Sequence, residues 1–306
     1  MISIVIPTQR RPGGLETAMR SAFAQTGIDP AGVELVVVDN DLVASARATI
    51  DRLRAEAPFA VTYVHEPDPG VANARNAALA AARGDYIAFL DDDEEAPEAW
   101  LKSLVETQAI FQADVVFGPV RGRAPRDVTR HRDYLERFFS RLGPEQSGLL
   151  DRHYGCGNSL LRRDSLPDRN RPFSPVRNFI GGEDDMLFGT MMANGARFAW
   201  SAEAWVWEDP VPERLTLSYT IRRSFAYGQG PSSACAAASP PDRVGIARWM
   251  VIGFFQAAAY GALAGFKAIL GARDYAQTLD RAAQGLGKLL WWSRFKIHFY
   301  GLRPAP

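Results

Sequence analysis

The sequence predicts an α/β domain with a mostly parallel central sheet, followed by a helical appendage. Three observations predict this fold class. Short β-branched runs alternate with helix-period segments over residues 1–118, which is the pattern of βαβ units. Residues 249–266 form an uncharged, apolar stretch near the C-terminus. The chain of 306 residues is 47% apolar, so it can fill a sizeable core and is not generally disordered.

The predicted strands are short, and helices are predicted between them. The strands cover residues 2–6, 33–38, 59–64, 86–90 and 114–117, and the helices cover residues 14–25, 42–57, 71–83 and 97–112. Residues 35–38 are apolar throughout, as expected of a central strand that is covered on both faces. The alternation therefore places the parallel sheet in the N-terminal part of the chain.

The alternation is interrupted at residues 119–153, which contain many arginines and few apolar runs. We interpret this stretch as an excursion with loops and a short helix at residues 134–142. Strands are predicted beyond it at residues 159–161 and 197–200, with a helix at residues 185–194 that ends at Gly195 in a left-handed conformation. We place the first domain at residues 1–212 and the appendage at residues 213–306.

Charge is distributed unevenly along a chain whose formal net charge is zero. Residues 1–210 carry 23 Lys and Arg against 31 Asp and Glu, whereas residues 211–306 carry 12 against 4. The overall balance excludes a polybasic nucleic-acid binder. The acidic N-terminal part suits a divalent cation, and the basic, aromatic C-terminal part suits an anionic membrane surface.

Cysteine usage and the N-terminal sequence indicate the cytoplasm. The two cysteines, Cys156 and Cys235, lack the spacing of a zinc site or of a disulfide framework. The chain begins with a predicted strand and shows no basic segment of the kind that opens a signal peptide. We therefore expect a cytoplasmic protein.

Two segments of the appendage have the composition of membrane-associating helices. Residues 249–266 would extend about 27 Å as a helix, just short of a hydrocarbon core of about 30 Å. Residues 286–300 mix aromatic side chains such as Trp291 and Trp292 with basic ones, which resembles an interfacial amphipathic helix. The sequence favours association with a membrane over an intramolecular helical hairpin, and it leaves open whether residues 249–266 cross the bilayer.

Five carboxylates follow directly on the predicted strand at residues 86–90. They are Asp91, Asp92, Asp93, Glu94 and Glu95. An open α/β sheet binds its ligands at this place, beyond the carboxyl ends of its strands. So many like charges repel one another unless a cation is bound, and carboxylates suit Mg²⁺ or Mn²⁺. The alternative is a solvated acidic helix start, because acids also favour a helix N-terminus.

Other polar residues follow the predicted strands at the same edge. Asp39 ends the second strand, where its carboxylate can accept hydrogen bonds from a base or ribose or can cap the next helix. Thr8 and Arg11 follow the first strand and offer a hydroxyl and a guanidinium to phosphates. Arg75 is expected in the first turn of a helix, either at an anion site or as a surface arginine paired with an acid.

Four short motifs occur in the order and spacing of a known family. They are Ser3-Ile4-Val5-Ile6-Pro7-Thr8, Val38-Asp39-Asn40, Gly70 with Arg75-Asn76, and Ala88-Phe89-Leu90-Asp91-Asp92-Asp93. Over about 210 residues the chain resembles family 2 glycosyltransferases of the GT-A fold. The resemblance implies a nucleotide-sugar donor, with Asp39 on uracil, Asp91 towards the ribose, and Asp93 and Asp91 on the metal. The implied donor site consists of Pro7, Thr8, Arg11, Asp39, Arg75, Asp91 and Asp92.

Three later motifs extend the resemblance. Gly155-Cys156-Gly157-Asn158 resembles the segment that lines the donor sugar and the acceptor. The sugar or acceptor contacts implied in this way are Gly157, Asn158, Glu183 and Trp207. Gly181-Gly182-Glu183-Asp184-Asp185 resembles the Glu-Asp motif whose Asp is the general base; Asp184 matches it, and Asp185 is the fallback. Val206-Trp207-Glu208-Asp209 resembles members that build bacterial exopolysaccharides, with Glu208 where others place a metal-binding His, so the third metal ligand stays open.

The resemblance implies a metal-dependent, inverting transfer of a sugar from a UDP-sugar to a hydroxyl of a saccharide or lipid-linked acceptor. The expected place is the inner face of the cytoplasmic membrane, in cell-surface polysaccharide synthesis. Two alternatives stay open. A sugar-nucleotide nucleotidyltransferase would show a Gly-rich basic loop after the first strand, which residues 7–14 imitate only in part. A non-catalytic sugar-nucleotide-binding subunit of a polysaccharide assembly complex would lack the acids, which are present.

Overall fold

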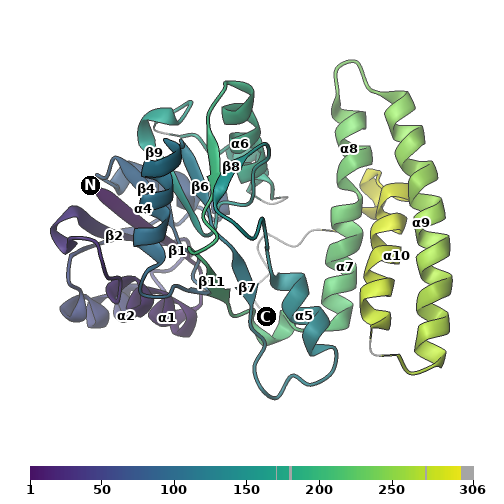
Figure 1. Ribbon diagram of the computed structural model, residues 1–306, viewed down its shortest axis with the longest axis horizontal. Coiled ribbons are helices and arrows are strands. Elements are labelled where there is room, and N and C mark those ends of the chain that lie inside the picture. The colour runs from purple at the N-terminus through teal and green to yellow at the C-terminus, as the bar shows by residue number, and fades with distance from the viewer. Residues whose placement is uncertain (170, 179–180, 273, 298–306) are drawn as a thin grey trace. The chain divides into compact units, whose positions relative to one another are not determined.

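The computed structural model describes residues 1–169, 171–178, 181–272 and 274–297. The chain divides into two compact units, each of which can be followed in Figure 1. The first comprises residues 1–121 and 140–209, and the second comprises residues 122–139 and 210–297 of the described chain. The end of the predicted appendage, at residues 298–306, and the last part of the predicted amphipathic segment 286–300 lie outside the described residues.

An eight-stranded sheet forms the centre of the first unit, in the order β3-β2-β1-β4-β9-β6-β10-β8. Its strands are β1 (Ile2–Thr8), β2 (Val33–Asp39), β3 (Ala60–His65), β4 (Tyr86–Phe89), β6 (Val115–Phe117), β8 (Gly148–Leu150), β9 (Ser159–Arg162) and β10 (Phe198–Trp200). The strands from β3 to β4 pair in parallel, as do β6 and β10, whereas β8 and β9 run antiparallel to their neighbours. The predicted α/β fold with a mostly parallel central sheet is confirmed.

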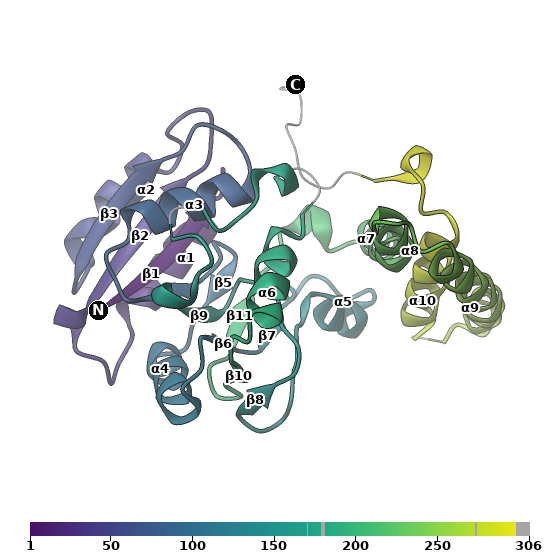
Figure 2. The same ribbon diagram turned by 90° about the horizontal axis from the view of Figure 1, so that it is seen from above.

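Helices cover both faces of this sheet because its central strands are apolar on both sides. Leu35 and Val37 of β2 belong to one core and Val36 and Val38 to the other. The first core is completed by α1 (Pro12–Phe23), α2 (Arg47–Leu53) and α4 (Trp100–Phe111), and the second by α3 (Val71–Ala81) and α6 (Glu183–Ala193). Figure 2 shows α3 and α4 on opposite sides of the strands. The carboxyl edge of the parallel strands is left for polar residues.

Helix α2 begins later than predicted. The expected helix at residues 42–57 starts as a loop, and α2 covers only Arg47–Leu53. The cause is Asp39, whose carboxylate accepts hydrogen bonds from the backbone amide of Ala46 at 2.7 Å and from the hydroxyl of Ser45 at 3.3 Å. Such local bonds from an Asp side chain compete with the helix for backbone donors. The loop before α2 is therefore held against the end of β2.

A small second sheet was not predicted from the sequence. It has the order β5-β11-β7, with β5 at Glu94–Glu95, β11 at Val206–Glu208 and β7 at Val120–Gly122. Strands β5 and β11 are antiparallel, with Trp207 opposite Glu95 and Glu208 opposite Glu94. Strands of two or three residues are too short for hydrophobic alternation to reveal them. This pairing fixes the acidic run as a turn and a strand, and α4 begins only at Trp100.

The second unit is helical. It contains α5 (Arg132–Phe139), α7 (Leu217–Gly228), α8 (Gly230–Ala237), α9 (Arg243–Ile269) and α10 (Tyr275–Leu289). Tyr134 and Leu135 of α5 share a small core with Leu215 and Ala276. The Tyr134 hydroxyl also donates a hydrogen bond to the Asp280 carboxylate at 3.0 Å. The excursion at residues 122–139 therefore packs with the C-terminal helices.

The prediction of one amphipathic helix over residues 286–300 is wrong within the described chain. Helix α10 ends at Leu289. Beyond it the chain turns, because the side chain of Gln229 donates hydrogen bonds to the carbonyls of Leu290 at 2.8 Å and Phe295 at 3.0 Å. The aromatic and basic side chains that follow α10 therefore do not share one helical face.

Helix α9 is, among the helices the structure describes, the one long and apolar enough to cross a membrane by length and composition. It contains the predicted apolar segment 249–266. Core helices of soluble proteins meet the same criterion but are mostly buried, whereas only 11% of the 18-residue apolar window of α9 is buried. Most of this apolar surface is therefore exposed within the unit.

A buried polar cluster joins β1 to β2 near the amino ends of the two strands. Glu34 is 1% exposed, and its carboxylate accepts hydrogen bonds from the hydroxyl of Ser3 and the backbone amide of Arg83, both at 2.6 Å. The Arg83 guanidinium forms an ion pair with the same carboxylate at 2.8 Å. A charge inside an apolar sheet is stable only with partners of this kind.

We predict that Glu34→Gln lowers the free energy of unfolding by about 1–3 kcal/mol, because an amide places an N–H group against these donors. Chemical denaturation measures the change. The matched control is Glu98→Gln on the exposed surface, which we expect to stay within about 0.5 kcal/mol of wild type. Equal losses in both variants would contradict the role given to the cluster.

Candidate functional site

The acidic turn, defined as residues 91–95, lies at the carboxyl edge of the sheet and is largely buried. Asp92 is 6% and Glu94 is 3% exposed. The backbone amide of Asp91 donates to the Glu94 carboxylate at 2.9 Å. The amide of Asp209 donates to the Asp93 carbonyl at 2.8 Å, which holds the end of β11 beside the turn. The alternative of a solvated acidic helix start is therefore excluded.

Burial raises the pKa values of three acids in this turn, Asp91, Asp92 and Glu94. It raises the pKa of Glu94 well above its usual range, and the charge of Asp91 adds to this effect. Burial raises the pKa of Asp92 to about 6, although the charge of Arg11 acts in the opposite direction. A nearby positive charge favours the ionised form of a buried acid, so a cation bound at this turn would stabilise the charge of its carboxylates. Their oxygen atoms are ligands that Mg²⁺ and Mn²⁺ prefer.

Asp92 and Thr8 bind each other instead of facing outwards. The Thr8 hydroxyl, in a residue that is 4% exposed, donates to the Asp92 carboxylate at 2.7 Å. Arg11 donates to Asp92 at 2.8 Å and to Asp93 at 2.7 Å. These bonds tie the end of β1 to the acidic turn, and the nucleotide contacts expected of Thr8 and Asp92 stay a prediction. Pro7, the residue before Thr8, is half-buried in β1.

Asp39 ends β2 at the same edge and is fully buried. Besides the bonds from Ala46 and Ser45, its carboxylate accepts one from the Tyr63 hydroxyl at 3.2 Å. A nucleobase would have to displace one of these partners to reach the carboxylate. Asp39, the residue predicted to contact uracil, therefore lies at the expected edge of the sheet, and the loop before α2 covers its carboxylate.

Arg75 and Glu183 form a buried ion pair and are 5% and 4% exposed. The guanidinium of Arg75 also lies 3.9 Å from the Asp91 carboxylate. Arg75 lies in the second turn of α3, and the amides in the first turn donate to the Asn178 side chain at 3.0 and 3.3 Å. The charges of Arg75 and Glu183 offset each other. The amides at the start of α3 are thus bonded to Asn178, and the donor contact of Arg75 and the sugar contact of Glu183 stay predictions.

The loop of residues 155–157 passes directly beside the acidic turn. A β-carbon built on Gly157 would lie 2.4 Å from the Asp91 carboxylate and 3.1 Å from the Glu94 carboxylate. No side chain fits in that space, so the approach requires glycine. The backbone at residue 157 therefore lines the same space as the acidic turn.

The same loop contacts the predicted base. Asp184, in the first turn of α6, accepts a hydrogen bond from the backbone amide of Cys156 at 3.0 Å. A β-carbon built on Gly155 would lie 3.3 Å from the Asp184 carboxylate and 2.8 Å from the guanidinium of Arg141. The loop therefore connects the acidic turn on one side with Asp184 and Arg141 on the other.

The remaining predicted residues lie around this centre. The Asp185 side chain is 72% exposed and lies 3.7 Å from His153. Trp207 and Glu208 are half-buried in β11, and Glu208 stands opposite Glu94 of the acidic turn. Glu208 is therefore brought next to acids that are more than a hundred residues away in the sequence.

Asn158 is fully buried and its side-chain amide is fully used. Its Nδ2 donates to the carbonyls of Pro119 and Ala204, both at 2.8 Å. Its Oδ1 accepts a hydrogen bond from the Trp100 indole at 2.7 Å. This contradicts the expectation that Asn158 contacts a sugar. Its role is to hold α4 and two loops together behind the site.

Sequence analysis missed Arg141. It lies two residues after the segment 122–139, in an arginine-rich stretch where nothing distinguishes it from its neighbours. Its backbone pairs with Val120 through hydrogen bonds of 2.8 and 3.0 Å, and its guanidinium donates to the Gly157 carbonyl. These contacts are visible only in three dimensions.

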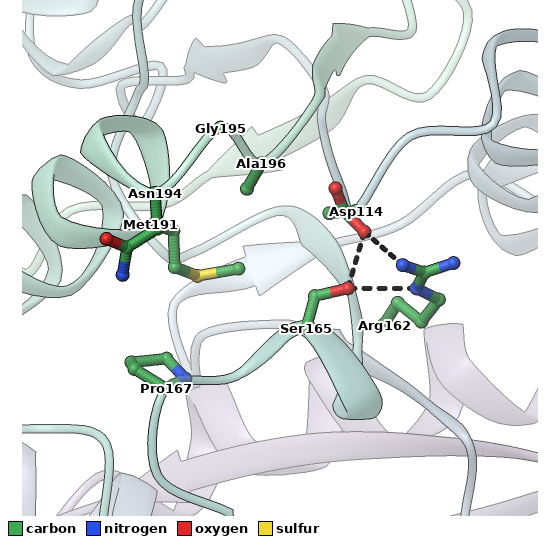
Figure 3. A pocket seen from close by; sticks show the side chains of 8 residues that line it. All are labelled: Asp114, Arg162, Ser165, Pro167, Met191, Asn194, Gly195 and Ala196. Carbon is green, nitrogen blue, oxygen red and sulfur yellow. Dashed lines mark hydrogen bonds and ion pairs between the residues drawn. The ribbon is translucent and has the colours of Figure 1, made fainter.

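A separate hollow in the first unit is shown in Figure 3. It is lined by Asp114, Arg162, Ser165, Pro167, Met191, Asn194, Gly195 and Ala196. The Arg162 guanidinium donates to the Asp114 carboxylate at 2.6 Å, so the main charges of the hollow are already paired. Asp114 precedes β6, which runs parallel to β4 because both are antiparallel to β9. The hollow thus lies at the sheet edge opposite the acidic turn.

The chain is similar to known proteins over most of its length. The family described as glycosyl transferase family 2 matches residues 3–169. The chain is 41% identical over 233 residues to the succinoglycan biosynthesis protein ExoM of Rhizobium meliloti (strain 1021). That alignment covers 74% of this chain and 73% of ExoM.

Two solved structures share the fold at low sequence identity. The mannosyltransferase PcManGT from Pyrobaculum calidifontis, in complex with GDP-Man and Mn²⁺, matches with a TM-score of 0.60 and 19% identity over 95% of this chain and 87% of that one. S. aureus TarS 1-349 in complex with UDP-GlcNAc matches with a TM-score of 0.53 and 15% identity over 94% and 90%. The predicted GT-A fold is confirmed. With its family match over more than half of its length and its identity to ExoM, the chain belongs to family 2 of the glycosyltransferases.

Proposed function

We propose that the chain transfers a sugar from a UDP-sugar to a hydroxyl of a saccharide or lipid-linked acceptor during exopolysaccharide synthesis, with a divalent cation and with inversion. The observation that carries this proposal is the loop of residues 155–157, which brings the acidic turn, Arg141 and Asp184 around one space. The similarity to a succinoglycan biosynthesis protein supports a polysaccharide product.

The choice of UDP rests on the family resemblance and on one of the similar structures. TarS holds UDP-GlcNAc, whereas PcManGT holds GDP-Man, so the shared fold accommodates both nucleotides. We favour UDP because Asp39 is the carboxylate that the resemblance assigns to uracil, and it ends β2 at the expected edge. Ser45, whose bond to Asp39 is long at 3.3 Å, is the partner that a base would displace most easily.

The acidic turn fits a divalent cation in its donor chemistry. The described residues contain no group of three or more His, Cys, Asp and Glu side chains placed to hold a metal. Mg²⁺ and Mn²⁺ take one or two carboxylates and complete their shell with water and phosphate oxygens, and the acidic turn offers carboxylates of this kind beside the loop of residues 155–157. We assign Asp93 and Asp91 as the carboxylates and Glu208 as a further candidate. Bound there, the cation would supply positive charge to the diphosphate.

Asp184 is the proposed general base. The acceptor oxygen attacks the anomeric carbon while its proton passes to the Asp184 carboxylate. The bond from that carbon to the diphosphate breaks, and its electron pair leaves with the diphosphate. The amides of Cys156 and Asp185 donate to the Asp184 carboxylate at 3.0 and 2.9 Å and so orient it. Asp185 itself is exposed and lies beside His153, which supports Asp184 over the fallback.

We predict that Asp184→Asn lowers turnover by about a hundredfold or more and leaves donor affinity nearly unchanged, because the base meets the acceptor and not the nucleotide. Steady-state kinetics and calorimetric titration with UDP measure the two effects. The control is Asp185→Asn, which should keep most of its activity. If Asp185→Asn is inactive and Asp184→Asn is active, the general base is Asp185 and the assignment of Asp184 is wrong.

We predict that Asp93→Ala abolishes the gain in UDP affinity that Mn²⁺ gives the wild type, because a coordinating carboxylate is lost. The fold should remain, since Arg11 keeps Asp92 as its partner. Calorimetric titration with UDP in Mn²⁺ and in EDTA measures the gain. The control is Asp151→Ala, whose side chain is 89% exposed. The metal assignment is wrong if Asp93→Ala responds to Mn²⁺ as strongly as wild type.

The proposed membrane association rests on the reversed polarity of α9. Its polar side chains face α10: Gln256 donates to the Arg281 carbonyl at 2.8 Å and accepts from Lys288 at 3.0 Å. Its large apolar side chains point away, with Phe255 66% and Phe266 60% exposed. A helix of a soluble domain shows the opposite arrangement. We therefore propose that α9 meets the inner face of the cytoplasmic membrane, aided by the basic charge of residues 211–306.

We predict that the full chain sediments with vesicles of phosphatidylglycerol and phosphatidylcholine at low salt, and that the double variant Phe255→Ser, Phe266→Ser sediments several-fold less. The reason is the loss of two exposed aromatic side chains from the apolar face. The control is Ile110→Ser, because Ile110 is 73% exposed on α4 of the first unit. A wild-type chain that stays in the supernatant would contradict the proposal.

A further inference from the structure

Arg141 is held firmly in the site by its backbone and by a hydrogen bond of its guanidinium. Its amide and carbonyl pair with Val120, and one terminal nitrogen donates to the Gly157 carbonyl. Its Nε is buried and has no hydrogen-bond partner. A guanidinium carries five N–H donors, and the bond to the Gly157 carbonyl uses one of its terminal nitrogens.

The position of this guanidinium is defined by the two glycines of the loop. Near Gly155, the guanidinium lies beside the Asp184 carboxylate. It also donates a hydrogen bond to the carbonyl of Gly157, and Gly157 itself lies against the Asp91 carboxylate. The positively charged guanidinium of Arg141 therefore lies between the acidic turn and the proposed base, Asp184. This is the region where the anomeric carbon and the departing diphosphate must come together if the proposed reaction takes place.

Arg141 differs from the other two arginines of the site. Arg11 pairs with Asp92 and Asp93, and Arg75 pairs with Glu183. Among the ion pairs of the described residues, none within 4.0 Å joins Arg141 to a carboxylate. The first two arginines form direct ion pairs with acids of the protein, whereas Arg141 acts on Asp91 and Glu94 only through the longer-range attraction of its charge. Arg141 remains as a planar, permanently charged fork, which matches the geometry of a phosphate.

We propose that Arg141 binds the β-phosphate of the nucleotide-sugar donor and neutralises the charge that builds up there when the bond to the sugar breaks. The inference rests on the proposed nucleotide-sugar donor. Arg141 gives no proton away in this step, because the electron pair stays on the diphosphate oxygen and the guanidinium only donates hydrogen bonds to it. A charged pair of this kind in a partly buried site strengthens as negative charge develops.

The test compares UDP, which has a β-phosphate, with UMP, which lacks it. We expect Arg141→Gln to weaken the binding of UDP by about tenfold to a hundredfold in EDTA, as for the loss of a charged hydrogen bond, and to leave the binding of UMP unchanged. The UDP affinity of Arg141→Lys should lie between those of the wild type and Arg141→Gln, because lysine keeps the positive charge and lacks the planar set of donors of a guanidinium. With substrate present, kcat should fall more than KM rises. Calorimetric titration and steady-state kinetics measure these changes.

The control is Arg152→Gln, because Arg152 lies nearby in the sequence and is 70% exposed. Two results in the binding assay overturn the inference. One is an unchanged affinity of Arg141→Gln for UDP, which together with reduced turnover would make Arg141 a positioning residue for Asp184. The other is an equal loss of affinity for UDP and UMP, which would mean a structural role. If the wild type binds GDP and not UDP, only the choice of UDP is wrong, and the role of Arg141 is then tested by comparing the binding of GDP with that of GMP. A wild type that binds neither nucleotide contradicts the proposed function itself.

Discussion

The burial of the acidic turn is the constraint on which the rest of the site depends. Like charges can be packed into one turn of a protein only when cations and hydrogen-bond donors are brought to them. Here the donors come from the end of β1 through Thr8 and Arg11. Arg75 comes from α3, and Arg141 comes from the segment whose backbone forms an isolated β-bridge with Val120. The turn therefore gathers three other parts of the chain, and its charge determines how each of them is used.

The outline of the fold could be predicted because its signals are local. The strands of the parallel sheet are apolar runs, and the acids directly follow one of them. The direction of that strand alone therefore predicts the edge of the sheet at which the acids lie. The limits of the helices are less local. The start of α2 depends on Asp39, and the end of α10 depends on Gln229, which lies some sixty residues earlier. No pattern within a short window contains these partners.

The roles of individual site residues depend even more on distant contacts. Thr8 and Asp92, which are expected to contact a nucleotide, are 84 residues apart in sequence and bind each other. Asn158 belongs to a motif that suggests a sugar, yet it serves three buried partners. Arg141 has no motif at all. The motifs predicted which segments meet at the site, and the three-dimensional contacts decide which side chains remain available to a ligand.

Family membership also separates the three functions that the motifs had left open. A nucleotidyltransferase would need a basic, Gly-rich loop to hold a triphosphate after β1. In this structure the arginine of that loop, Arg11, is already bound by Asp92 and Asp93. A non-catalytic binding subunit would not need to maintain a costly buried cluster of acids beside Asp184. Both arguments agree with membership of a glycosyltransferase family.

The assignment of residues 122–139 to the second unit has a practical consequence for dissecting the protein. A chain cut after residue 212 would still carry α5, but it would have lost Leu215 and Ala276, which cover Tyr134 and Leu135. The shortened protein would display an apolar patch on a segment that returns directly into the site at Arg141. Separating catalysis from the helical unit therefore requires redesigning this inserted segment as well as removing the C-terminal helices.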